Sequence, residues 1–401
     1  MSAASDRGRL PSPDPLLLWS AGLLLALGLV LVTSASMPMA EKVTGNPFHY
    51  ALRQCIYALV AIGLAAGVVR YVKLEHLRLA SPGLLGATAV LLAALLIPGL
   101  GHEVNGSLRW MRLGPINVQI SEIAKLVSLV YVAAYLSRHT NAVRETFWGA
   151  FRPLLPLSIL AGLILAEPDL GAAGVMLTTA FAMVFLAGMR LLPVFMTVLA
   201  SILVLGPALY LSPYRLARLT SFRNPWADPF GDGFQLTQSL IAIGRGEVSG
   251  VGIGDSVQKL FYLPEAHTDF IFAVMAEELG FVGVLALMIL YAVLVWRCFA
   301  IGYRAESAGV AFGAHLSYGV GVWFALQCLI NLGVNMGLLP TKGLTLPLVS
   351  YGGSSLLMMG VALGLVLRLD RELSVPQRRR GARAKRTMRC PVPDAAAEGS
   401  A

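Results

Sequence analysis

Long apolar stretches, separated by short polar connections, recur along almost the whole chain. A stretch of about 17 to 25 apolar residues is long enough for an α-helix to cross a hydrocarbon core about 30 Å thick. We therefore predict an all-α polytopic membrane protein. Its ten predicted transmembrane helices are residues 16–36, 54–70, 80–98, 120–137, 154–166, 170–188, 193–211, 268–296, 307–331 and 347–367.

The composition agrees with this pattern and leaves no room for a separate soluble domain. Of the 401 residues, 56% are hydrophobic and only 13% are charged, against about 25% charged in soluble proteins. The first apolar stretch is too long for the core of a signal peptide, so we expect it to be a retained helix. The 4 cysteines lie far apart without a CxxC pattern, which argues against a zinc site or a disulfide framework.

The positive charges predict which connections face the cytoplasm. Most of the 31 Lys and Arg residues fall on one set of alternate connections and in the two terminal segments, so the positive-inside rule places both termini in the cytoplasm. The predicted domains are a cytoplasmic arm at 1–15, a membrane domain at 16–367 and a basic, disordered cytoplasmic tail at 368–401. An extracytoplasmic segment at 212–267 is the longest connection and joins the predicted helices seven and eight. The net charge of +9 follows from this bias, and we expect no nucleic-acid binding.

The expected outer ends of the helices carry an unusual set of charged residues. A charge near the centre of a membrane helix costs about 2.5 to 3.5 kcal/mol, so such residues normally face a polar cavity and pair with one another. Glu122, Lys125, Glu277 and Glu278 fit this description, and we expect Lys125 to form a structural ion pair with Glu277 or Glu278. Asp269 lies at the predicted mouth of the eighth helix, where it could cap the helix or meet a substrate.

Cations on the same side suit a diphosphate. Arg109, in a short connection beside a tryptophan, and Lys342 are the predicted contacts to such a group. The arginines between residues 215 and 223 could instead bind lipid headgroups. The glycine-rich stretch "SGVGIGDS" (249–256) lacks the ending of a phosphate-binding loop, so a flexible or re-entrant turn is the better interpretation.

Five motifs together resemble one protein family. They are "RWMRLGPINVQISEIAK" (109–125), "EPDLG" (167–171), "FRNPWADPFGDGFQLTQSLIAIGRG" (222–246), "GVGIGDSVQKLFYLPEAHTDFIFAVMAEELG" (250–280) and "NMGLLPTKGLTLPLVSYGGSS" (335–355). The sequence resembles the SEDS family (shape, elongation, division and sporulation), and is most similar to its cell-division branch. Isoleucine at 120 stands where the family commonly has proline, which affects only the start of the local helix.

The resemblance implies a ten-helix glycosyltransferase that joins lipid II units, carried on undecaprenyl pyrophosphate, into peptidoglycan at the outer face of the cytoplasmic membrane. The family's essential aspartate corresponds to Asp269, and His267 and Ser354 in the same motifs are added to the predicted substrate contacts. No metal site or required cofactor is predicted, although Mg²⁺ could assist. The implied partners are the septal class B penicillin-binding transpeptidase and other division proteins.

Two other function classes stay open at this point. A lipid II flippase would also use charges inside the membrane, but it would need polar pathways that reach both faces. A scaffold that only recruits the transpeptidase would not require Asp269 or the cations. Because the motif-rich connections all fall on the predicted outer side, we favour the polymerase.

Overall fold

The computed structural model describes residues 13–97, 101–104, 107–113, 116–189, 222, 224–231, 233–341 and 343–387. For residues 101–104, 107–109, 112, 113, 116 and 375–387 it describes the main chain alone. The elements are α1 (Pro15–Thr44), α2 (His49–Tyr71), α3 (Leu74–Leu95), β1 (Gly101–Val104), β2 (Ser107–Leu113), β3 (Ile116–Gln119), α4 (Ile120–Arg138), α5 (Thr140–Glu145), α6 (Phe147–Phe151), α7 (Leu154–Ala166), α8 (Leu170–Leu186), a 3₁₀ turn (Pro225–Ala227), α11 (Phe234–Gly246), α12 (Ile271–Ser307), α13 (Ala311–Asn335) and α14 (Gly353–Thr387).

The chain is a multi-pass membrane protein. In the described part, 8 helices are long and apolar enough to cross a membrane, with α6 and α7 counted as one, and α8 is apolar but shorter. The predicted span 193–211 lies outside the described residues. Two predicted starts came too early, because α12 begins at Ile271 and α14 at Gly353. α14 also continues to Thr387, so the first part of the expected disordered tail is helical.

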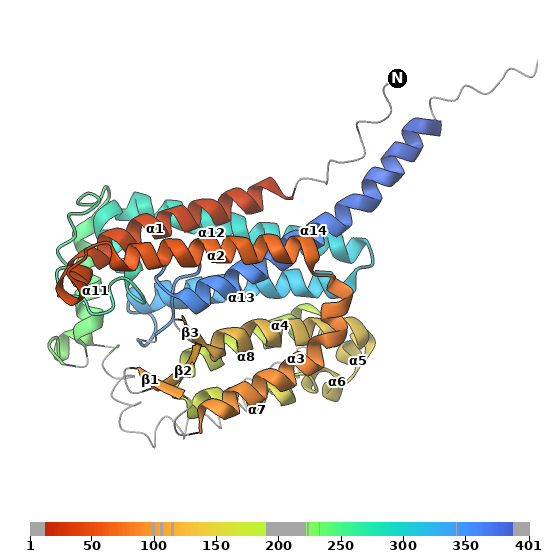
Figure 1. Cartoon of the computed structure of the whole chain (residues 1–401), viewed down its shortest axis with the longest axis horizontal. Coiled ribbons are helices and arrows are strands. Elements are labelled where there is room, and N and C mark those ends of the chain that lie inside the picture. Colours follow the sequence, from red (N-terminus) through yellow and green to blue (C-terminus); the bar gives the residue numbers. More distant parts are fainter. Residues whose placement is uncertain are drawn as a thin grey trace, which may run out of the picture.

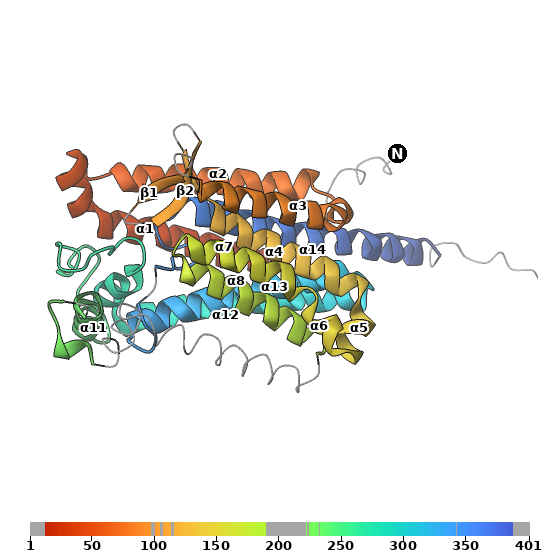
Figure 2. The ribbon, with the colours of Figure 1, turned by 90° about the horizontal axis from the view of Figure 1, so that it is seen from below.

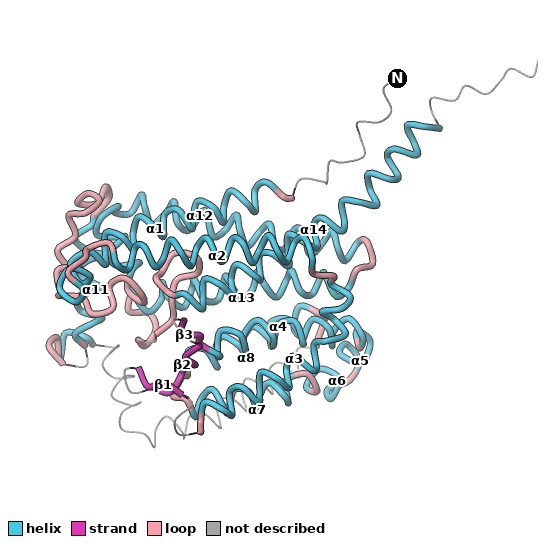
Figure 3. The backbone as a smooth tube through the Cα atoms, in the orientation of Figure 1, coloured by secondary structure: helices cyan, strands magenta, loops and turns pink. Residues whose placement is uncertain are grey.

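A small antiparallel sheet departs from the all-α prediction (Figure 3). Its strand order is β1-β2-β3, and β2 pairs with β3 so that Trp110 faces Gln119 and Met111 faces Val118. The sequence places Gly114 and Pro115 between these strands, which is a turn signal. The sheet leads directly into α4, whose first residue follows Gln119.

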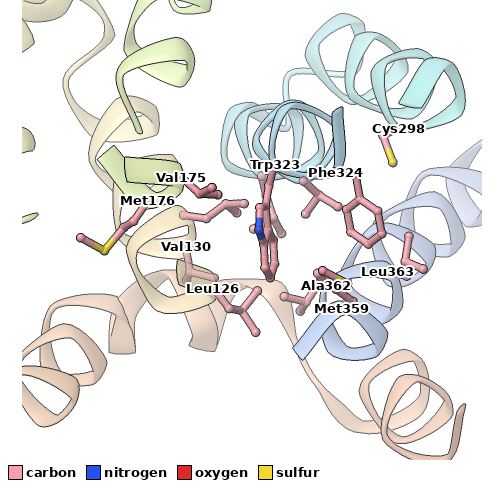
Figure 4. Close-up of a cluster of buried hydrophobic side chains, with 14 of the residues drawn as sticks. Leu126, Val130, Val175, Met176, Cys298, Trp323, Phe324, Met359, Ala362 and Leu363 are labelled. Carbon is pink, nitrogen blue, oxygen red and sulfur yellow. The ribbon is translucent and has the colours of Figure 1, made fainter. Parts of the chain in front are cut away.

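The bundle is built around α13. Figures 1 and 2 show the long helices running roughly side by side, with the sheet and α11 at one end of the bundle and the start of α1 at the other. Trp323 and Phe324 of α13 are both buried and fill the space between α4, α8 and α14, as Figure 4 shows. Burial of such large side chains fixes the helices that carry the polar groups described below.

α12 is a broken helix. Gly280 has φ 63° and ψ −164°, a conformation that glycine tolerates without steric cost. The break frees main-chain groups, and four hydrogen bonds to the connection after α11 satisfy them: the amides of Val251 and Gly252 donate to the carbonyls of residues 277 and 278, and those of residues 281 and 282 donate to the carbonyls of 247 and 248. Close approach requires glycine at 250 too, because a Cβ there would lie 2.2 Å from the Glu278 carbonyl oxygen.

An ion-pair network closes the opposite end of the bundle. Asp14 caps α1 and forms an ion pair with Arg297, while Arg304 donates to Asp370 at 2.8 Å. The main-chain amide of Asp14 also donates to Asp370 at 2.9 Å. Burial alone would raise the pKa of Asp14. Hydrogen bonds from Arg297 and from the Leu17 amide, together with the charges of Arg297 and Arg304, outweigh burial, so the pKa is lowered. The start of α1 and the part of α14 around Asp370 are thereby held together with α12.

Candidate active site

A cavity of about 560 Å³ opens at the end of the bundle that carries the sheet. This volume is within the usual range for a binding site of a small ligand or part of a larger one. Elements from across the chain contribute to its walls, including α2, β2, β3, α4, α8, α14 and the connections before α12 and α14. The polar and aromatic lining residues are Tyr50, Arg53, Tyr57, Trp110, Asn117, Gln119, Glu122, Asp169, Glu265, His267, Thr268, Asp269, Thr345, Tyr351, Ser354 and Ser355.

Asp269 faces this cavity from the turn before α12. The helix starts two residues later and its N-cap position is Phe270, so Asp269 lies one residue before the cap position. The glycine at 343 lies against the carboxylate: a Cβ built there would be 3.1 Å from Oδ2 of Asp269. The connection between α13 and α14 therefore reaches the carboxylate with its main chain.

Aromatic rings and one arginine form a second wall. The rings of Tyr50, His267 and Tyr351 lie within 5.0 to 5.5 Å of one another, centre to centre. Arg53 and Tyr57 follow Tyr50 on the same face of α2, because positions three, four and seven residues apart lie together. Such a wall of rings, with a cation beside it, suits a sugar and an anionic group.

The imidazole of His267 is neutral at neutral pH. Burial lowers its pKa, and the nearby Glu265 carboxylate only partly opposes this. Burial also raises the pKa of Tyr351, as does neighbouring Tyr57, while Arg53 lowers it through its charge and a hydrogen bond. Arg53 and Tyr351 thus line the same part of the cavity.

Ser354, Gln119 and Asp169 together connect three elements at the cavity. The Ser354 hydroxyl accepts a hydrogen bond from the Gln119 amide at 3.0 Å and donates to the Asn117 carbonyl at 3.3 Å. Asp169 caps α8 and accepts hydrogen bonds from the side chains of Gln119 and Ser121. The start of α14, strand β3 and the start of α8 are thus joined at the cavity.

Glu122 and Lys125 form a buried ion pair with each other. Lys125 Nζ lies 2.9 Å from Glu122 Oε1 and 3.2 Å from the side-chain oxygen of Gln327. It also lies 5.4 Å from the ring centre of Trp323. The expected pairing of Lys125 with Glu277 or Glu278 is wrong, because helix α4 already supplies the carboxylate one turn from the lysine.

Glu277 and Glu278 do not line the cavity, and both are buried. Glu277 accepts hydrogen bonds from the Ser256 hydroxyl, two main-chain amides and Arg245. Glu278 accepts from Lys259 at 2.9 Å and from Ser34 at 2.6 Å. These carboxylates attach the glycine-rich connection to α12 and α1. The stretch "SGVGIGDS" is therefore a turn whose main chain packs closely against α12.

Two predicted cation contacts are not placed by the structure. Lys342 and the side chain of Arg109 lie outside the described residues, although the main chain of Arg109 is in β2. The sequence pattern alone does not single out Arg53, Glu265 or the aromatic wall. The i, i+3, i+7 spacing of Tyr50, Arg53 and Tyr57 was the available signal. Among the side chains that the structure describes, no group of three or more His, Cys, Asp and Glu could hold a metal ion.

The sequence matches the family model described as a cell cycle protein, FtsW/RodA/SpoVE, over residues 15–375. It is 55% identical over 350 residues to a probable peptidoglycan glycosyltransferase FtsW of Thioalkalivibrio sulfidiphilus, covering 87% of each chain. It is 51% identical to the protein of the same description from Coxiella burnetii, over 87% of this chain and 94% of that one.

Solved structures agree with these similarities. A chain of a peptidoglycan synthase complex that coordinates polymerization and crosslinking superposes with a TM-score of 0.73, at 31% identity, covering 90% of this chain and 99% of that one. The rod shape determining protein RodA of Thermus thermophilus gives a TM-score of 0.65 at 29% identity, covering 90% and 98%.

Proposed function

Because the chain belongs to the FtsW/RodA/SpoVE family of cell cycle proteins, we propose that it is a peptidoglycan glycosyltransferase that polymerises lipid II into β-1,4-linked glycan during septal wall synthesis. The observation that carries the proposal is the cavity, which Asp269 lines together with a wall of aromatic rings and an arginine. A lipid-linked disaccharide offers a sugar for the rings and a diphosphate for the cation.

The reaction needs one base. The 4-hydroxyl of the GlcNAc in an incoming lipid II attacks C1 of the MurNAc at the end of the growing chain, and Asp269 accepts the hydroxyl proton. The new C–O bond forms as the bond from C1 to the diphosphate oxygen breaks, and undecaprenyl diphosphate leaves with the electron pair. A single displacement inverts the α-linked donor to a β-linked product.

Cations stabilise the leaving diphosphate. Arg109 and Lys342 remain our proposed contacts, and the cavity adds Arg53, whose planar guanidinium can bind two phosphate oxygens at once. His267 and Ser354 are proposed to contact the sugar, as a neutral imidazole and a hydroxyl. Mg²⁺ could add charge neutralisation.

The proposed setting is the division septum, with both termini in the cytoplasm and the cavity on the outer side. The similarity to a chain of a peptidoglycan synthase complex supports a partner that crosslinks the strands, and we propose a septal class B penicillin-binding transpeptidase. The placement of the start of α1 at the end of the bundle remote from the cavity is consistent with this orientation.

Purified protein supplied with lipid II, alone and with the transpeptidase, tests the proposal. We expect glycan ladders that disappear in Asp269→Asn, with Ser317→Ala as a control far from the cavity. Wild-type ladders from a folded Asp269→Asn protein would refute the assignment of the base. Lipid II translocation in sealed vesicles without any ladders would instead support the flippase.

A further inference from the structure

Three amide side chains form a row along the buried face of α13. Gln327, Asn331 and Asn335 are spaced one helical turn apart and are each no more than 2% exposed. Burying an amide group without a hydrogen-bond partner is costly, so the acceptor of each side-chain amide shows which part of the structure that amide holds. Gln327 donates to the carbonyl of Thr345 at 3.0 Å. The other two donate to the main chain of the residue that carries the proposed base.

Asn331 and Asn335 both donate to the main-chain carbonyl of Asp269. The distances are 2.9 Å from Asn331 Nδ2 and 3.1 Å from Asn335 Nδ2. This carbonyl lies two residues before the first residue of α12, Ile271, and the amides of Ala273 and Val274 donate to the carbonyl of Phe270. The two asparagine amides therefore fix the main chain just before the helix.

The same asparagine also holds the facing connection. Asn331 Nδ2 donates to the carbonyl of Leu344 at 2.6 Å. Its neighbour Gly343 is the residue at which a Cβ would come within 3.1 Å of Asp269 Oδ2. One amide group thus sets the separation between the turn that carries Asp269 and the segment that approaches its carboxylate.

We propose that Asn331 and Asn335 are positioning residues for Asp269, an inference that rests on the proposed function of that aspartate. They hold its main chain so that the carboxylate faces the cavity at a fixed distance from residues 343 and 344. A second tie supports the same turn: the amide of Tyr351 donates to the carbonyl of His267 at 3.0 Å. Because carbonyls 267 and 269 are both held, the turn has little freedom to rotate the carboxylate away.

The test compares Asn331→Ala/Asn335→Ala with Ser317→Ala. The control also removes a buried hydrogen bond from α13 to a main-chain carbonyl, that of Cys298, but on a part of the helix that does not reach the cavity. The purified proteins are assayed with lipid II and the transpeptidase partner, and rates are normalised to lipid II binding sites so that loss of folded protein does not lower kcat.

We expect the double variant to lose at least about tenfold in kcat with KM changed less than about threefold, because misplacing a reacting group by about 1 Å can cost about a hundredfold. The acid limb of its kcat–pH profile should also move, since the surroundings of the carboxylate change. Ser317→Ala should keep the wild-type kcat and the wild-type kcat–pH profile. A folded double variant with wild-type kcat and pH profile would overturn the inference.

If the thermal midpoint of the double variant is lower than that of Ser317→Ala, the single variant Asn335→Ala is used to test the inference. It leaves the Asn331 hydrogen bond in place, so we expect a loss in kcat of about two- to fivefold at unchanged KM, and no change in kcat would overturn the inference. Asp269→Asn separates the two proposals. If it is active, the proposed base is wrong; if it is inactive while the asparagine variants are normal, only the positioning role fails.

Discussion

The buried pair of Glu122 and Lys125 offers a quantitative test of how the membrane domain tolerates charge. Both side chains are almost fully buried, with 7% and 2% of their surface exposed. Glu122 Oε2 has no hydrogen-bond partner, so compensation of this carboxylate comes through the 2.9 Å contact of Oε1 with Lys125. Replacing Lys125 by Met removes that contact and leaves a buried charge.

The expected cost is about 3 to 5 kcal/mol in the free energy of unfolding, which is typical for breaking a buried ion pair from one side. A hydrogen bond to a charged group accounts for about 1.5 to 3 kcal/mol of this. The side-chain oxygen of Gln327 loses Lys125 as a donor but keeps the hydrogen bond from Trp323 Nε1 at 2.8 Å. Glu122→Gln combined with Lys125→Met leaves no buried charge, so the double variant should recover all but about 1 to 2 kcal/mol.

The assay is a double-mutant cycle by denaturant titration in detergent micelles, with the wild type, both single variants and the double variant. Lys125→Ala/Glu122→Gln serves as a second double variant in which the volume of the lysine is also lost. A Lys125→Met protein within about 1 kcal/mol of wild type would show that water or a rearranged side chain compensates Glu122, and the reasoning would be wrong.

Three further results are expected. Arg53→Ala should raise the KM for lipid II by about tenfold and Arg53→Lys by less, because only the guanidinium binds two phosphate oxygens; equal KM values in polymerisation assays would exclude such contact. Gly250→Ala should lower the free energy of unfolding by more than about 2 kcal/mol in denaturant titrations, since the new Cβ would meet the Glu278 carbonyl at 2.2 Å and φ is +78°. Because the pKa of His267 is lowered, its contribution to stability is complete above the unfolded pKa of about 6.5 and is lost as the pH falls through the folded pKa. The thermal midpoint of wild type should therefore fall on acidification more steeply than that of His267→Gln, and parallel curves would contradict this.

The helices were predictable because a hydrocarbon core demands a definite length of apolar chain, and α7 begins and ends where the hydrophobic pattern placed it. The ends of α12 and α14 were not. Phe270 and the mostly apolar residues 347 to 351 adjoin the apolar stretches, but tertiary hydrogen bonds from α13 and between residues 267 and 351 hold these segments as turns. Hydropathy does not record such contacts.

Charge partners were the least predictable part of the site. The sequence offers more than one ion-pair partner for the buried residues Glu122, Lys125, Glu277 and Glu278. Which pairs form depends on distances across the helix bundle. Lys125 forms its ion pair with Glu122 on its own helix, while Glu278 pairs with Lys259 of the connection between α11 and α12. Arg53 was overlooked for the same reason: its position on α2 became meaningful only once Tyr351 and His267 were placed beside that helix.

The broken helix α12 has a mechanical consequence. The parts of α12 before and after Gly280 are each hydrogen-bonded to residues 247–252 at the break. A partner that displaces that connection therefore acts on both parts of α12 together. The part before Gly280 begins two residues after Asp269, so such a displacement reaches the proposed base through main-chain hydrogen bonds and less than three turns of helix. Mechanical load on this connection is thereby coupled to the geometry around Asp269.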